Sequence, residues 1–316
     1  MAARKRMPGA PEPMRYWEGH SGIRIAGDHW GQENGPLVVL LHGGGQTRHA
    51  WKGAGEALGE AGYQAIALDA RGHGDSGWAP NGDYGQDAQV ADLVNVVAQL
   101  GNKRPVLVGA SMGGGTSLGA IGEDHIDATA LILVDVAPQI EKDGARRIME
   151  FMRQKPEGFD TLEEVAEAIS NYQPHRERPR KLDGLAKNLR LGDNNKFHWH
   201  WDPEFMSRPR DMEKRSERLA ACAKKLTLPT LLVRGGLSDV LSEEGARKFL
   251  DLCPHAIYVN VTDAAHMVAG DRNDIFSKSV IDFLGQNVPV QGEPVQRPHV
   301  THPHHEGPPG DVEDIP

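Results

Sequence analysis

Six short apolar runs recur along the chain and alternate with longer segments of helical periodicity. The runs cover residues 37–41, 63–68, 105–108, 130–134, 231–233 and 256–261. Of the helical segments, residues 86–100 repeat apolar side chains every three or four positions, and residues 242–252 and 273–284 follow the same pattern. Near-continuous apolar runs of this length between helices are typical of buried parallel strands. The pattern predicts an α/β protein with a mostly parallel sheet, to which a hairpin near residues 14–25 adds an antiparallel edge.

The alternation stops after Pro138 and resumes at Thr227. The intervening stretch is rich in charges and helical patterns and contains no convincing strand. We therefore expect a helical lid at residues 139–226, inserted into a core of residues 14–138 and 227–287. Residues 1–13 and 288–316 are expected to be disordered, because the tail has many prolines and almost no large apolar side chains. The tail histidines are more typical of a solvated segment than of a metal site: His299, His302, His304 and His305.

Composition narrows the classes of function. The 44 acidic residues outnumber the 35 Lys and Arg residues, so a net charge of -9 argues against a general nucleic-acid binder. The two cysteines have no metal-like or disulfide-like spacing. No apolar run approaches the length of a membrane span, and the basic N-terminus lacks the apolar stretch of a secretory signal. These features predict a cytoplasmic monomer or homodimer without a nucleic-acid or membrane partner.

The strongest chemical signal is a Gly-x-Ser-x-Gly motif centred on Ser111, directly after the apolar run that ends at Val108. A serine in a sharp turn from strand to helix has a strained backbone, and the flanking glycines let neighbouring backbone pass close by. The turn exposes the hydroxyl above the sheet. Ser111 is therefore the candidate nucleophile, although an ordinary helix N-cap would also use a serine at this place.

A second signal is the glycine-rich segment that begins at His42, at the end of the first central strand. An oxyanion that develops during acyl transfer needs preorganised donors, and a glycine loop can present bare backbone N–H groups. We predict that the N–H groups of Gly44 and Met112 form an oxyanion hole. An ordinary glycine-rich turn is the alternative.

A base and an acid are needed to activate a serine hydroxyl. His266 follows the last apolar run, at the edge of the sheet where Ser111 is expected, and is the candidate base. Asp239, after the run at residues 231–233, completes the chain order Ser, Asp, His and is the candidate acid. Asp135, after the run at residues 130–134, competes for that role but could instead cap a turn.

Taken together, four segments and one histidine resemble the α/β-hydrolase superfamily: residues 42–44, 69–76, 109–114 and 235–239, and His266. The resemblance covers roughly residues 14–287 and implies an eight-stranded, mostly parallel sheet with a helical lid. Within the superfamily, the chain resembles the lid-bearing branch that includes esterases, lactonases, C–C bond hydrolases and peroxidase-like members. Epoxide hydrolases and haloalkane dehalogenases of the superfamily carry an aspartate where this chain has Ser111, so their chemistry is not expected. The loop at residues 69–76 is expected beside the site, with Arg71 and Asp75 stabilising its turns.

These observations predict a serine hydrolase that cleaves an ester or lactone of a small, largely apolar molecule without a metal or organic cofactor. Trp199 and Trp201, in an unusually aromatic part of the lid, are candidates for the substrate-binding wall, and packing of the lid onto the core is the alternative role. Hydrolysis of a carbon–carbon bond in a diketone-like compound would use the same triad. A non-catalytic receptor for small molecules is the alternative of a different class.

Overall fold

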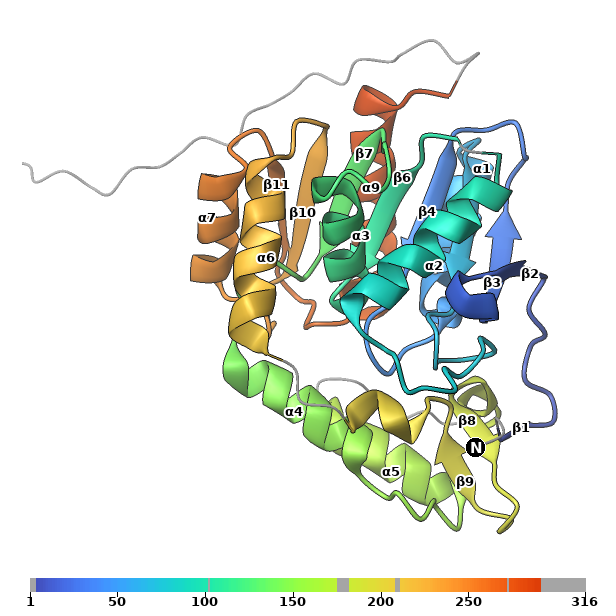
Figure 1. Cartoon of the computed structure of the whole chain (residues 1–316). Helices are drawn as coiled ribbons and strands as arrows, with labels where there is room; N and C mark the ends of the chain where they lie inside the picture. Colours follow the sequence, from blue (N-terminus) through green and yellow to red (C-terminus); the bar gives the residue numbers. More distant parts are fainter. Residues whose placement is uncertain (1–3, 102, 175–181, 208–210, 272, 291–316) are drawn as a thin grey trace, which may run out of the picture.

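The structure, a computed structural model, describes residues 4–101, 103–174, 182–207, 211–271 and 273–290, and its centre is an eight-stranded sheet (Figure 1). In spatial order the strands are β11 (Ile257–Val261), β10 (Thr230–Gly235), β7 (Ala130–Val134), β6 (Val106–Ala110), β4 (Leu37–Leu41), β5 (Gln64–Leu68), β3 (Arg24–Trp30) and β2 (Arg15–Glu18). Neighbouring strands are parallel from β11 to β5, and β3 and β2 add an antiparallel edge. The predicted mostly parallel sheet of eight strands and its N-terminal edge hairpin are confirmed.

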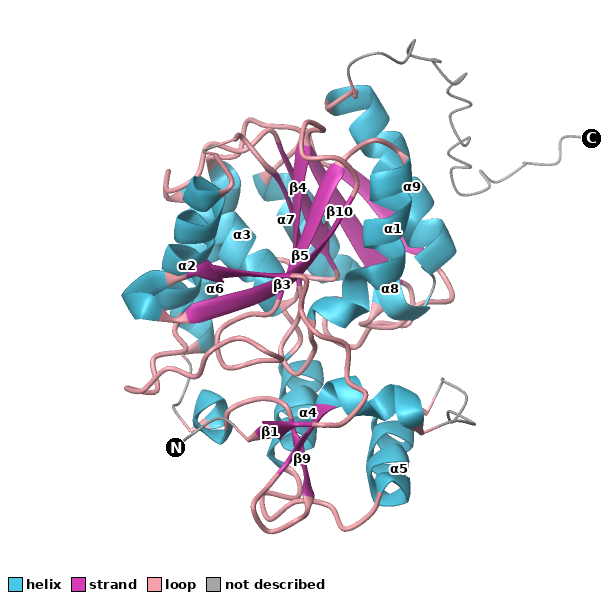
Figure 2. Ribbon diagram, turned by 90° about the vertical axis from the view of Figure 1, so that its right-hand side faces the viewer, coloured by secondary structure: helices cyan, strands magenta, loops and turns pink. Residues whose placement is uncertain are grey.

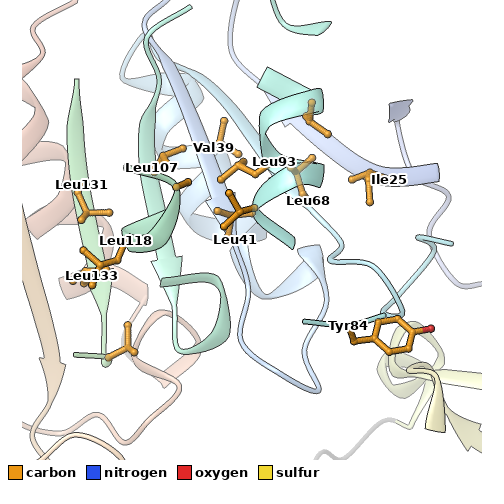
Figure 3. Close-up of a cluster of buried hydrophobic side chains, with 14 of the residues drawn as sticks. Ile25, Val39, Leu41, Leu68, Tyr84, Leu93, Leu107, Leu118, Leu131 and Leu133 are labelled. Carbon is orange, nitrogen blue, oxygen red and sulfur yellow. The ribbon is translucent and has the colours of Figure 1, made fainter. Parts of the chain in front are cut away.

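Helices cover both faces of the sheet, because the central strands are buried throughout and their successive side chains point to opposite faces. On one face, α2 (Gln86–Gln99), α3 (Met112–Gly122), α6 (Met212–Lys224) and α7 (Glu243–Leu252) share a core with side chains such as Val39, Leu41 and Leu107 (Figure 3). On the other face, α1 (Lys52–Glu60), α8 (Val268–Asp271) and α9 (Asn273–Asn287) pack on Val38 and Leu40. None of the helices in the described ranges combines the length and apolarity that crossing a bilayer requires.

Between β7 and β10 the chain leaves the sheet and builds a separate lobe, seen below the sheet in Figures 1 and 2. Its elements are α4 (Lys142–Arg153), α5 (Leu162–Tyr172), the 3-10 helices η3 (Asp183–Asn188) and η4 (Pro203–Met206), and the strands β8 (Leu189–Leu191) and β9 (Phe197–Trp199). These elements, together with β1 (Lys5–Arg6), are called the inserted lobe below.

The inserted lobe differs from the expected helical insertion in three ways. It contains a small antiparallel sheet, β1-β8-β9, whose two- and three-residue strands are too short to leave a periodic signal in the sequence. Since β1 belongs to this sheet, the prediction of a disordered N-terminus was wrong for the described residues from Arg4 on. Finally, α6 packs against α3 in the core, so the core resumes at Met212 rather than at residue 227.

The C-terminal segment begins in order. The hydroxyl of Tyr63 donates a hydrogen bond to the carbonyl oxygen of Val288, 3.1 Å away, and Val290 packs beside the same part of the core. Disorder from residue 288 was therefore wrong for residues 288–290. The rest of the predicted tail, with its four histidines, lies outside the described residues.

The loop at residues 69–76 joins the core to the inserted lobe. Arg71 forms a buried ion pair with Asp92 of α2. Asp75 pairs with three arginines from different elements: Arg6 in β1, Arg48 in η2 (Arg48–Trp51) and Arg190 in β8. Burial alone would raise the pKa of Asp75, but these arginines outweigh it and hold that pKa below its ordinary value. Asp75 thus does more than stabilise its own turn, because its carboxylate links Arg6 and Arg190 of the inserted lobe to Arg48 of the core.

Candidate active site

Ser111 occupies the tight turn between β6 and α3. Its φ of 47° and ψ of -108° lie outside the regions that L-residues ordinarily adopt. A Cβ at Gly109 would collide with the carbonyl oxygen of Gly113, and a Cβ at Gly113 would collide with that of Leu41. The two motif glycines are therefore required by the close approach of backbone at this turn. The Ser111 side chain makes no capping hydrogen bond to α3, which leaves the hydroxyl available for chemistry.

His266 and Asp135 form a hydrogen-bonded pair at the carboxyl edge of the same sheet. Asp135 directly follows β7, and its Oδ2 lies 2.6 Å from Nδ1 of His266. The Asp135 carboxylate is fully buried and also accepts hydrogen bonds from the Gly235 N–H, at 2.9 Å, and from the Ser238 hydroxyl. These hydrogen bonds supply the buried carboxylate with polar partners. It is placed to hold the imidazole in the tautomer that carries its proton on Nδ1.

Asp239 does not occupy the position that the sequence suggested. Its carboxylate pairs with Arg147 of α4 at 3.0 Å, and its side chain remains 39% exposed. The assignment of Asp239 as the partner of His266 was therefore wrong, and Asp135, the competing candidate, holds that place. The physical reason is that the loop after β10 turns Ser238, one residue earlier, toward the imidazole side, whereas Asp239 faces the inserted lobe.

The glycine loop after β4 has one backbone donor to spare. The N–H of Gly43 donates to Oε1 of Gln46 at 3.0 Å, and the N–H of Gly45 donates to Nε2 of His73 at 3.2 Å. Among the described residues, neither the N–H of Gly44 nor that of Met112 has an acceptor. Met112 follows Ser111 in the chain, and Gly44 follows Gly43, on which a Cβ would lie 3.3 Å from the Cβ of Ser111. The arrangement suits the oxyanion hole predicted for Gly44 and Met112.

Three buried histidines, His42, His73 and His200, contact this glycine loop and one another. The rings of His42 and His200 lie 5.3 Å and 5.8 Å from that of His73, centre to centre. His42 Nδ1 lies 2.7 Å from the carbonyl oxygen of Gly43, and His200 Nε2 lies 3.3 Å from that of Gly45. Burial lowers the pKa of His42 and lowers that of His200 well below its ordinary value, so both are neutral near pH 7. His200 follows β9, so the inserted lobe directly contacts the loop that carries Gly44.

A cavity of about 470 Å³ opens in front of these groups. Gly44, Ser111 and His266 line it from the core, and Trp199 and Trp201 line it from the inserted lobe. The two indole rings stack with centres 5.2 Å apart and continue into a cluster with three further aromatic side chains: Phe151, Phe159 and Tyr172. Both tryptophans are almost wholly buried, so they both anchor the lobe and form a wall of the cavity.

Comparison with known proteins agrees with this geometry. The family model of the α/β hydrolase fold matches residues 36–272, which is most of the chain. The chain belongs to the α/β hydrolase fold family.

Two relatives of this α/β hydrolase cover most of its length. The esterase Rv0045c of Mycobacterium tuberculosis is 28% identical over 289 residues, covering 86% of this chain and 90% of the esterase. The 3-hydroxybutyrate-oligomer hydrolase of Cupriavidus necator is 26% identical over 258 residues, covering 77% of this chain and 87% of that enzyme. Among solved structures, E-2-(acetamidomethylene)succinate hydrolase superposes with a TM-score of 0.73 at 21% identity, covering 85% of this chain and 98% of that one. At 21% identity, the similarity to this solved structure shows a shared fold and no more.

The site of this α/β hydrolase contains residues that the sequence did not single out. Ser238 shares the Asp135 carboxylate with His266, yet in the sequence it is merely the residue before the more conspicuous Asp239. His73 and His200 lay within segments already noted, but a chain with 15 histidines gives no reason to prefer them. Only the fold brings residues 73 and 200 against the glycine loop.

Proposed function

We propose that this α/β hydrolase is a serine hydrolase that cleaves a carboxylic ester or lactone of a small, largely apolar molecule. Ser111 attacks the carbonyl carbon and forms an acyl-enzyme. His266 takes the hydroxyl proton and passes it to the leaving oxygen, and then activates the water that releases the acid. Asp135 holds the imidazole and stabilises its cationic form, and the N–H groups of Gly44 and Met112 bind the oxyanion.

The observation that carries the proposal is the convergence of three groups on one cavity. A strained serine, a histidine paired with a buried carboxylate and a glycine loop with a free donor all meet its walls or lie directly behind them. The apolar and aromatic lining supplied by the inserted lobe suits a small organic acyl or alcohol group. The names of the relatives, an esterase and a 3-hydroxybutyrate-oligomer hydrolase, support ester cleavage.

A panel of 4-nitrophenyl esters, lactones and vinylogous diketones tests the reaction class. We expect turnover of esters or lactones, labelling of Ser111 by a serine-directed phosphonate, and a loss of about 10⁴-fold or more in kcat for Ser111→Ala with the fold intact. Turnover confined to diketones would replace ester cleavage by C–C bond cleavage. A folded wild-type protein that binds these compounds, turns none of them over and is not labelled would be a receptor instead.

A further inference from the structure

The cavity in front of Ser111 has an apolar part and a polar part. Side chains of α4, α5, β9 and the segment after β9 make the apolar part: Ile148, Phe151, Met152, Ile169, Trp199 and Trp201. The polar part comes from the segment before and within η2 and from the end of η3, which contribute Gln46, Thr47, His49, Lys187 and Asn188. A substrate that fills the whole cavity therefore meets both apolar and polar side chains.

Lys187 is the one lysine or arginine among the described residues that line this cavity, and none of those residues is an aspartate or a glutamate. His49, its neighbour in the polar part, does not add a second charge near pH 7. Burial and the charge of Arg48 lower the pKa of His49 to about 4. The cavity thus presents a single cation and no counter-charge of its own.

The ammonium group of Lys187 has no acidic partner within the described part of the chain. Desolvation by surrounding atoms and the nearby charge of Lys52 lower the pKa of Lys187, although the residue as a whole remains exposed. Two other lysines of the inserted lobe do have such partners, since Lys155 pairs with Glu164 and Lys196 with Asp160. A bound anion would give the ammonium group of Lys187 a partner that the described residues do not supply.

We propose that Lys187 binds a carboxylate on the substrate, remote from the scissile carbonyl, so that the preferred substrates are esters or lactones that also carry a free acid. This inference rests on the proposed function, since it assigns a charge to the substrate of the same site. The ammonium group and the substrate carboxylate form a charge-assisted hydrogen bond, while the remainder of the substrate contacts the aromatic wall.

Matched substrates isolate this charge. The mono-4-nitrophenyl ester of adipic acid and 4-nitrophenyl hexanoate differ only in a terminal carboxylate in place of a methyl group. We expect Lys187→Met to lower the ratio of kcat/KM for adipate over hexanoate by about tenfold or more, mainly through KM for the adipate ester. Lys187→Glu lowers the ratio further and raises turnover of an ester with a terminal trimethylammonium group.

Lys52→Met is the matched control. Lys52 is an exposed lysine that pairs with Glu56 and does not line the cavity, so its removal should leave the adipate-to-hexanoate ratio within about twofold of wild type. If Lys187→Met leaves the ratio unchanged as well, or if both lysines change it equally, the carboxylate site is refuted. Equal losses with both esters for Lys187→Met would make the lysine a structural residue and would also refute the proposal.

Binding of free adipate separates the subsite from the chemistry. Calorimetric titration of the Ser111→Ala protein with adipate should show binding that Lys187→Met, made in that background, weakens by about tenfold. If the wild-type protein hydrolyses neither ester while adipate binding depends on Lys187, the subsite is upheld and the proposed hydrolysis is refuted. Hydrolysis of both esters without Lys187-dependent binding would do the reverse.

Discussion

Asp135→Asn is the substitution that most sharply tests the candidate triad. The asparagine has almost the same shape as the aspartate, and its environment determines how the amide lies. The Gly235 N–H donates to Oδ1, so the amide oxygen takes that position. The amide nitrogen then replaces Oδ2, the atom that faces both His266 Nδ1 and the Ser238 hydroxyl.

This amide orientation reverses the hydrogen bond to the imidazole. The NH₂ group of the asparagine donates to His266 Nδ1, so the ring must carry its proton on Nε2, where it can no longer accept the proton of Ser111. The substitution also removes the negative charge that stabilises the imidazolium ion during the reaction. We expect kcat to fall by about 10⁴-fold, as loss of the correct tautomer does in serine proteases.

Asp239→Asn provides the control within the same chain. The exposed pair with Arg147 is worth at most about 1 kcal/mol, and nothing connects it to the imidazole, so kcat should stay within about twofold of wild type. Both variants are compared by 4-nitrophenyl ester kinetics, with thermal unfolding to show that each remains folded. A folded Asp135→Asn protein with more than a tenth of wild-type kcat, or an Asp239→Asn protein with the larger loss, would refute the assignment of Asp135.

Three further predictions concern the inserted lobe and its contacts. In steady-state kinetics, Trp201→Ala should raise KM for bulky esters more than for acetyl esters, and the difference should correspond to a loss in binding free energy of about 1 kcal/mol for each lost CH₂ contact. Equal losses of kcat for both ester classes, with lower thermal stability, would show that Trp201 only anchors the lobe. His200→Ala should lower kcat by about tenfold while KM for a small ester changes little, because the Gly44 donor acts mainly in the transition state; a change in KM alone would contradict this. The pKa of His200 is depressed in the folded protein, so below about pH 6.5 the unfolded chain binds a proton that the folded protein does not. Denaturant titrations should therefore show the free energy of unfolding decreasing as the pH falls below that value, by about 1.4 kcal/mol per pH unit for this group. His200→Gln should lessen that slope.

The sequence predicted the sheet well because its signals are local. Each central strand is an uninterrupted apolar run, and a buried parallel strand needs just that pattern, so β4 was found to the residue. The short strands β8 and β9 gave no such signal, and β1 forms only because the inserted lobe offers it a partner more than 180 residues away. Pairing over such a separation depends on the assembled fold rather than on local preference.

The candidate site likewise contains residues that local sequence signals predict and residues that only the fold identifies. Ser111 and His266 were singled out because each follows a predicted strand, and Gly44 because its neighbours are glycines; the structure places all three at one cavity. The choice between Asp135 and Asp239 depended on which carboxylate turns toward the imidazole, and spacing does not encode that direction. Both aspartates follow adjacent strands, β7 and β10, so either could have reached His266 from the sheet edge.

The backbone at Asp135 explains why the carboxylate turns toward the site. The ladder of parallel hydrogen bonds runs one residue past each strand, since Ser111 N–H bonds to Val134 O at 3.2 Å and Asp135 N–H bonds to Val233 O at 2.7 Å. Each of these residues then adopts a positive φ, 47° at Ser111 and 50° at Asp135. Such conformations cost about 1–3 kcal/mol each and persist only where the surroundings fix them. The sheet thus fixes both residues at the ends of neighbouring strands, where Asp135 bonds to His266 and Ser111 lines the same cavity as His266. Asp239 needs no such conformation to reach Arg147, and its side chain stays partly exposed.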